Sequence, residues 1–96
     1  MIIFDEGALD DLEEIFGFTR EFDPEWAVSQ VARIQRAVLV LDENPFIGRR
    51  VSGEIRELVI SSGKTGFIAL CQYEELDDLV RILAVRHQRQ AGYRGR

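Results

Sequence analysis

Hydrophobic and polar positions change their period along the chain, and each period predicts a different element. Residues 1–4 form a short apolar run of the kind found in β-strands, and residues 6–17 then repeat apolar positions at helical spacing. Asp5 is predicted to cap this helix through its side-chain oxygen, and Gly17 is predicted to end it. The acidic residues of the helix are predicted to face solvent: Asp10, Asp11, Glu13 and Glu14.

A second helix has the clearest pattern in the sequence. Asp23 is predicted to cap it, and Pro24 fits its first turn, where a missing N–H costs nothing. Asn44-Pro45 is predicted to end it, because the residue before a proline avoids the α region. The apolar positions follow spacings of four, three, four and three, which is typical of two helices packed as a hairpin: Ala27, Val31, Ile34, Val38 and Leu41.

The second half of the chain alternates with the period of a β-strand. A loop is predicted over residues 45–53, and three strands over 55–60, 67–73 and 79–85, joined by short turns. Short turns between consecutive strands indicate an antiparallel meander, whose strand 67–73 is apolar on both faces and should be central. The predicted fold is α+β, with an N-terminal strand and a helical hairpin packed on a small antiparallel sheet (β-α-α-β-β-β), as a single domain over residues 1–96.

Composition narrows the classes of protein that remain. The chain is 46% hydrophobic with a net charge of −5, which predicts a soluble globular domain and argues against a general nucleic-acid coat protein. Cys71 is the only cysteine, so no intramolecular disulfide can form, and it is predicted to be a small buried hydrophobe in a reducing compartment. Neither a basic signal-peptide start nor a long apolar stretch is present, so a cytoplasmic protein without membrane segments is expected.

Basic residues are concentrated at the C-terminal end of this acidic chain. Residues 81–96 contain five arginines and the only histidine but no acid: Arg81, Arg86, His87, Arg89, Arg94 and Arg96. Three interpretations of the arginines remain open: a solvated sheet edge, an anion-binding patch, and a docking surface for an acidic partner. Arg49, Arg50 and Arg56 would join the same surface if the loop folds back over the sheet.

The candidate chemistry of individual residues is limited. His87 could act as a base in phosphodiester cleavage, with arginines stabilising the transition state, or it could simply hydrogen-bond backbone at a strand end. Gly63-Lys64-Thr65 imitates the end of a phosphate-binding loop, but Leu58 stands where that loop needs a glycine and a strand follows. With no second histidine and no cysteine pair, neither a metal site nor a cofactor is predicted.

The chain resembles the RelE/ParE superfamily of bacterial type II toxins over nearly its whole length. Five segments carry the resemblance: Ala-Leu-Asp-Asp-Leu-Glu-Glu-Ile at 8–15, Asn-Pro-Phe-Ile-Gly-Arg at 44–49, Ile-Arg-Glu-Leu-Val-Ile at 55–60, Gly-Phe-Ile-Ala-Leu-Cys-Gln-Tyr at 66–73 and Val-Arg-Ile-Leu-Ala-Val-Arg-His-Gln-Arg at 80–89. The resemblance implies a toxin, of the kind linked to growth inhibition and plasmid stabilisation. It would be neutralised in a hetero-oligomer by a cognate antitoxin that wraps a disordered segment around it.

The superfamily holds two activities, and the resemblance leaves both open. RelE-like members cut messenger RNA on the ribosome, whereas ParE-like members inhibit DNA gyrase without hydrolysis. This chain is acidic and has one lysine, and Ile68 stands where RNA-cutting members often place an arginine. A ParE-like gyrase inhibitor is therefore favoured over a RelE-like endonuclease, and a degenerate antitoxin-binding co-regulator is the third alternative.

The resemblance also assigns candidate site residues. If the chain is a ribonuclease, the catalytic candidates are Arg56, His87, Arg89 and Tyr93. The candidates for binding the target or another partner are Arg49, Arg56, Arg81, Arg86, His87, Arg89 and Tyr93.

Overall fold

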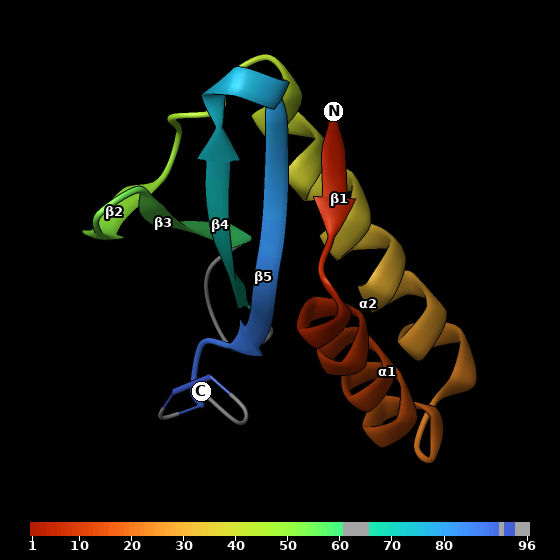
Figure 1. Ribbon diagram of the computed structural model, residues 1–96. Helices are drawn as coiled ribbons and strands as arrows, with labels where there is room; N and C mark the ends of the chain where they lie inside the picture. Colours follow the sequence, from red (N-terminus) through yellow and green to blue (C-terminus); the bar gives the residue numbers. More distant parts are fainter. Residues whose placement is uncertain (61–65, 91, 94–96) are drawn as a thin grey trace.

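The computed structural model describes residues 1–60, 66–90 and 92–93, which form two helices packed on one five-stranded sheet (Figure 1). The elements follow in the order β1 (Ile2–Phe4), α1 (Glu6–Arg20), α2 (Pro24–Ala37), the 3₁₀ segment η1 (Val38–Asp42), β2 (Arg49–Ser52), β3 (Ile55–Ile60), β4 (Phe67–Glu74), the 3₁₀ segment η2 (Glu75–Asp77) and β5 (Leu79–His87). The predicted α+β class is confirmed. The predicted turn over 61–66 and the Gly63-Lys64-Thr65 motif lie almost wholly outside the described residues.

The sheet has the strand order β1-β5-β4-β3-β2, with β4 in the middle as predicted. The strands β2 to β5 pair antiparallel, but β1 pairs parallel with β5, with Ile2 opposite Val80. The sheet is therefore mixed rather than wholly antiparallel. A parallel pair needs a long connection, and both helices and the whole meander provide one here.

The prediction of a loop over residues 45–53 is wrong in part, because Arg49–Ser52 form the edge strand β2. Arg49 pairs with Glu57 and Arg50 with Arg56, and a register shift follows before Ser52. All four residues of β2 are exposed, so they carry no apolar alternation that would reveal a strand. Backbone pairing with β3, rather than side-chain burial, holds this strand in place.

Helix α1 differs from its prediction at both ends. It continues past Gly17 to Arg20, because one glycine costs a helix only about 1 kcal/mol and the Thr19 hydroxyl bonds Gln30 of α2 at 2.8 Å. Asp5 does occupy the capping position, but its side chain makes no capping hydrogen bond. The Asp5 carboxylate instead forms an ion pair with Arg81 at 3.0 Å.

Helix α2 matches its prediction closely. The Asp23 carboxylate accepts the Trp26 backbone N–H at 3.1 Å, and Pro24 lies in the first turn. The α-helix ends at Ala37 and continues as η1 to Asp42, just before Asn44-Pro45. Four seam residues are fully buried and Val31 is half-buried: Ala27, Ile34, Val38 and Leu41.

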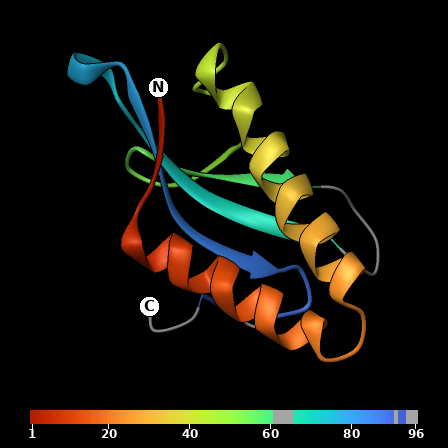
Figure 2. The same cartoon turned by 90° about the vertical axis from the view of Figure 1, so that its right-hand side faces the viewer.

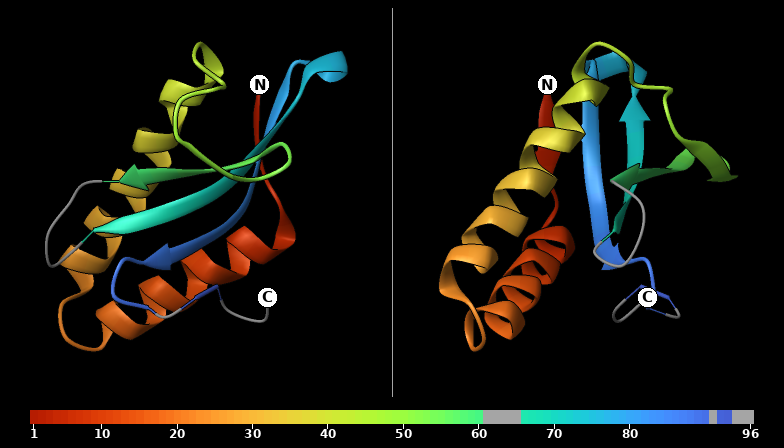
Figure 3. Two further views of the ribbon diagram at one scale, coloured as in Figure 1. Left: turned by 90° about the vertical axis from the view of Figure 1, so that its left-hand side faces the viewer. Right: turned by 180° about the vertical axis from the view of Figure 1, so that it is seen from behind.

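Both helices cover the same face of the sheet, and the hydrophobic core lies between them and β4 and β5 (Figure 2). Core side chains from the sheet include Phe67, Ala69, Ile82 and Val85. The other face has no helix over it, and we call it the helix-free face (Figure 3). In the described part of the chain, neither helix is long and apolar enough to cross a bilayer.

Candidate functional site

A bulge in the β4–β5 pair decides which way the basic residues of β5 point. Cys71 lies opposite Ile82 and Leu70 opposite Ala84, so Leu83 is an extra residue in β5. In a regular strand Arg81 and Arg86 would lie on opposite faces, because they are five positions apart and side chains alternate between the faces. The extra residue places both on the helix-free face, opposite Gln72 and Ile68.

His87 points to the other side of the sheet. It pairs with Phe67, and the two rings make an edge-to-face contact with centroids 5.4 Å apart. Its Nδ1 accepts the Arg89 backbone N–H at 3.1 Å. The imidazole therefore lies on the helix-covered side, while Arg86, the residue before it, lies on the helix-free face.

Glu57 is the centre of a polar cluster on the helix-free face. Its carboxylate accepts hydrogen bonds from Arg49 at 2.7 Å and from the Tyr93 hydroxyl at 2.6 Å. The Arg86 guanidinium stacks over the Tyr93 ring, 5.1 Å from its centroid. The hydrogen bond from Tyr93 lowers the pKa of Glu57, and burial together with that same bond raises the pKa of Tyr93 to about 12.

Arg86 also organises the turn that follows β5. Its Nη1 donates to the backbone carbonyls of His87, Gln88 and Gln90, at distances of 3.3, 3.4 and 2.8 Å. The backbone N–H of Gln88 bonds to the Gly66 carbonyl, which fastens the start of this turn to β4. Arg86 is thus built into the fold rather than presented freely to a partner.

Arg81 is held by two carboxylates. Its Nε donates to Glu74 at 2.8 Å and its Nη1 to Asp5 at 3.0 Å. These bonds join β5 to the neighbouring strand β4 and to the start of α1. The charge of Arg81 is therefore balanced within the chain.

Arg56 lies apart from the other predicted site residues. It is on the helix-covered side of β3, where its guanidinium stacks 5.4 Å from the Phe46 ring centroid and donates to the Gly48 carbonyl. The Arg89 side chain is exposed, and Arg94 and Arg96 lie outside the described residues. The seven predicted partner-binding residues therefore fall on two sides of the sheet and do not form one cationic surface.

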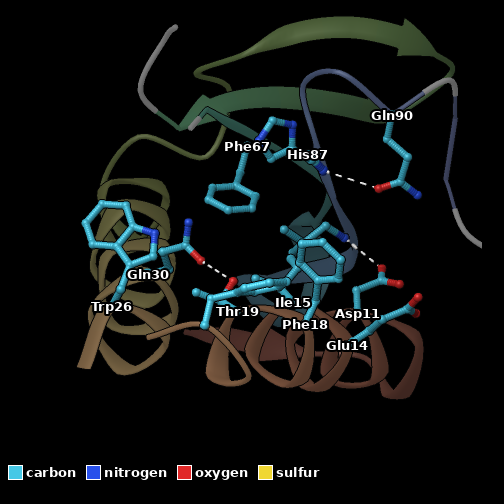
Figure 4. Close-up of a pocket in the computed structure, with 12 residues that line it drawn as sticks. Asp11, Glu14, Ile15, Phe18, Thr19, Trp26, Gln30, Phe67, His87 and Gln90 are labelled. Atoms are coloured by element: carbon cyan, nitrogen blue, oxygen red, sulfur yellow. Dashed lines mark hydrogen bonds between the residues drawn. The ribbon is translucent and has the colours of Figure 1, made fainter. Parts of the chain in front are cut away.

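The helix-covered side contains an open pocket of about 540 Å³ between the helical hairpin and the ends of β4 and β5 (Figure 4). Aromatic side chains and polar ones such as Glu14 share its lining, and the Thr19–Gln30 hydrogen bond lies in its wall. The side chains that line it include Phe18, Phe22, Trp26, Phe67 and His87. This apolar concavity has no counterpart in the prediction, although Phe18, Phe22 and Trp26 stand close together around the predicted helix boundary.

Asp11 is the main residue that the sequence pattern placed wrongly. It is 3% exposed rather than solvent-facing, and its carboxylate accepts the Val85 backbone N–H at 2.9 Å (Figure 4). Strand β1 covers this edge of β5 only as far as Ile82. Beyond that point the Asp11 side chain of α1, rather than another strand, accepts a hydrogen bond from the backbone of β5. Asp11 follows Ala8 by three residues, and this spacing was the available signal that it shares the buried face.

The described residues offer little for covalent or metal chemistry. They contain no group of three or more potential metal ligands. Burial raises the pKa of the Cys71 thiol to about 11, so it stays protonated and unreactive at neutral pH. Tyr93, with its raised pKa, is likewise poorly suited to accept a proton.

Comparison with known proteins gives the family. A family model described as the ParE toxin of the type II toxin-antitoxin system, parDE, matches residues 2–92. The chain belongs to the ParE toxin family. This ParE toxin is thus a toxin of a type II toxin-antitoxin system, and no curated protein matches it significantly.

Solved structures share the fold of this ParE toxin. A chain of the chromosomal ParDE system from P. aeruginosa superposes with a TM-score of 0.73 at 22% identity, covering 90% of this chain and 92% of that one. The intact E. coli RelBE complex contributes a match with a TM-score of 0.63 at 16% identity, covering 94% and 98%. The isolated E. coli RelE toxin matches with the same score and identity, covering 95% and 86%.

Proposed function

We propose that this ParE toxin inhibits growth by binding DNA gyrase, without hydrolysing a substrate. The observation that carries the proposal is the placement of His87 and Arg86 on opposite faces of β5. A proton-transferring imidazole and a phosphate-stabilising guanidinium must reach the same phosphodiester, and here the sheet lies between His87 and Arg86. Arg56 is on the same side as His87, but it is held at Phe46 and Gly48.

The rest of the helix-free face supports a binding protein. Glu57 brings a negative charge to its centre, and Val59 and Ile68 are apolar neighbours on β3 and β4. An RNA-cleaving surface needs cations that clamp phosphates, and the net charge of −5 opposes RNA binding further.

The alternative is a ribosome-dependent endonuclease of the RelE type. The stacking of Arg86 on Tyr93 favours it, because a cation and a hydroxyl then lie together on one face. In that mechanism Tyr93 would have to accept or donate a proton. Its pKa of about 12 and its bond to Glu57 keep the hydroxyl protonated at neutral pH, so almost no tyrosinate is present to act as a base.

We also propose that a cognate antitoxin holds this toxin in a hetero-oligomer in the cytoplasm. The pocket between the helical hairpin and the sheet is concave and lined with aromatic side chains. Such a surface suits a disordered segment that folds on binding and buries its apolar side chains there.

Two assays on the same purified toxin test the proposal. We expect the protein to inhibit gyrase supercoiling and to leave ribosome-bound messenger RNA intact, and we expect His87→Gln to retain growth arrest. Messenger RNA cleavage that Tyr93→Phe or His87→Gln abolishes would establish the endonuclease instead. A correctly folded protein that arrests no growth without antitoxin would indicate the degenerate co-regulator.

A further inference from the structure

A second exposed apolar region lies at the end of the molecule away from the pocket. It is formed by the segment between η1 and β2, residues 43–48, which we call the Phe46 loop (Figure 3). Phe46 is 51% exposed and Ile47 is 40% exposed. Exposed apolar side chains on neighbouring positions of a loop mark an interaction site more often than scattered ones do.

The Phe46 loop is rigidly built, although its apolar side chains face outwards. The Phe46 ring makes an edge-to-face contact with Tyr73, with centroids 5.3 Å apart, and its face receives the Arg56 guanidinium. The Ile47 N–H bonds to the Asn44 carbonyl at 3.1 Å, and Asn44 itself bonds twice to the Val40 carbonyl. A loop fixed at this many points holds its exposed side chains ready for a partner and loses little entropy on binding.

Gly48 fixes the end of the loop against β3. Its φ of +106° is in the region that favours glycine, and a Cβ there would lie 2.6 Å from the Glu57 carbonyl oxygen. The Arg56 guanidinium donates to the Gly48 carbonyl at 3.3 Å. The chain therefore passes closely over β3 before it enters β2.

Two arginines beside the loop are directly opposite one another. Arg50 of β2 pairs with Arg56 of β3 in the antiparallel register. Like charges in this position repel, and whereas Arg56 holds Phe46 and Gly48, the fold gives no reason for a second arginine at position 50. The Arg50 side chain is exposed and has no carboxylate partner within residues 1–60, 66–90 and 92–93, which leaves its charge available to an acidic surface.

We propose that Phe46, Ile47, Arg50 and Arg56 form the surface by which the toxin grips its protein target. The partner that fits is a folded protein with an apolar pocket rimmed by carboxylates. The side chains of Phe46 and Ile47 enter the pocket, and the arginine pair meets the acidic rim. This inference rests on the proposed function, because it takes the toxin to act by binding a protein.

The shapes of the two apolar regions assign them to different partners. The pocket at Phe22 and Trp26 is concave and suits the side chains of a disordered segment that folds on binding. The Phe46 loop presents outward side chains on a fixed backbone, and such anchors need a pocket that already exists on a folded partner. The target therefore binds the Phe46 loop, and the antitoxin is assigned to the pocket.

A pair of matched phenylalanine variants tests this assignment. Phe46→Ser should weaken target inhibition and growth arrest by about tenfold or more, as expected for a buried interface anchor, and leave binding of the cognate antitoxin unchanged. Phe22, which is 76% exposed at the other end, supplies the control. Phe22→Ser should weaken antitoxin binding and leave target inhibition unchanged. Circular dichroism and thermal unfolding of both variants verify that each is folded.

Charge reversal tests the acidic rim separately. Arg50→Glu should reduce growth arrest and slow association with the target, with a loss that shrinks as salt is raised. Arg36→Glu, at an exposed position in the last turn of α2, is the control and should have no effect.

The outcomes separate this inference from the proposed function. If the wild-type toxin leaves gyrase supercoiling unaffected, gyrase is not the target, but loss of growth arrest in a folded Phe46→Ser protein still supports the surface. Full growth arrest by both Phe46→Ser and Arg50→Glu would overturn the inference even if gyrase is inhibited. Loss of antitoxin binding in Phe46→Ser with toxicity retained would overturn it too, because the loop would then belong to the antitoxin.

Discussion

Tyr93 and Glu57 are thirty-six residues apart in the sequence, and they meet through a 2.6 Å hydrogen bond across the helix-free face. The bond fastens the segment after β5 to β3, two strands away. Arg49 bonds to the Glu57 carboxylate and Arg86 stacks on the Tyr93 ring, so the cluster joins charged side chains of β2, β3 and β5. The first prediction concerns this cluster.

Tyr93→Phe is expected to lower the free energy of unfolding by about 1–2 kcal/mol, because a partly buried carboxylate loses a charge-assisted bond. The pKa of Glu57 is lowered in the folded protein from its ordinary value of 4.5, so the bond's contribution is complete above pH 4.5. It is lost as the pH falls through the lowered folded value. Urea unfolding of wild type and Tyr93→Phe from pH 7 down to pH 3 measures the difference between their free energies of unfolding, which should shrink as the pH falls. Tyr73→Phe, which loses an exposed bond to Asp78, is the control and should cost less.

Asp11→Ala is expected to destabilise the protein by about 2 kcal/mol, because the Val85 N–H would be left buried without an acceptor. Asp11→Asn keeps a carbonyl oxygen at this position and should cost less than Asp11→Ala. Asp10→Ala, at the exposed neighbouring position, serves as the control. Chemical denaturation ranks the three variants, and equal stability of Asp10→Ala and Asp11→Ala would contradict the assigned role.

Gly48→Ala is expected to cost about 2–3 kcal/mol, because the added Cβ meets the Glu57 carbonyl and φ is unfavourable for any other residue. Gly53 also has a positive φ, of 53°, but open space surrounds it. Gly53→Asn should therefore be nearly neutral, since asparagine tolerates the left-handed region. Thermal unfolding compares the two, and a Gly48→Ala protein as stable as wild type would show that the loop is not fixed as described.

Arg81→Gln is expected to destabilise the protein only slightly, because Asp5 and Glu74 lose a shared cation at a partly exposed site. The loss should be local, with faster hydrogen exchange at the Val80 N–H, which bonds to the Met1 carbonyl. Raising the salt concentration should shrink the difference from wild type. Unchanged exchange along β1 and β5 would mean that the ion pairs do not hold the first strand.

The parts of the fold that depend on residues close together in the sequence were predicted correctly. The seam of α2, its Asp23 cap and the meander all follow from spacing and turn residues, and all are present. The strand β2 was missed because its side chains are all exposed and only its backbone is paired. The Asp5 side chain does not cap α1, because its carboxylate pairs instead with Arg81, 76 residues away in the sequence.

The candidate site could not be assembled from the sequence for a similar reason. Whether Arg81 and Arg86 share a face depends on a single bulged residue, Leu83, and alternation alone gives the opposite answer. The register of β5 against β4 also decides to which side of the sheet the His87 side chain points. Which arginines are already paired depends on acids far along the chain, such as Asp5 for Arg81, and no spacing rule predicts such a pair.

The parallel pairing of β1 with β5 also sets an order for completing the sheet. Ile2 can pair with Val80 only after both helices and the strands between them have been synthesised, so β1 is made first among the strands but can be paired only late.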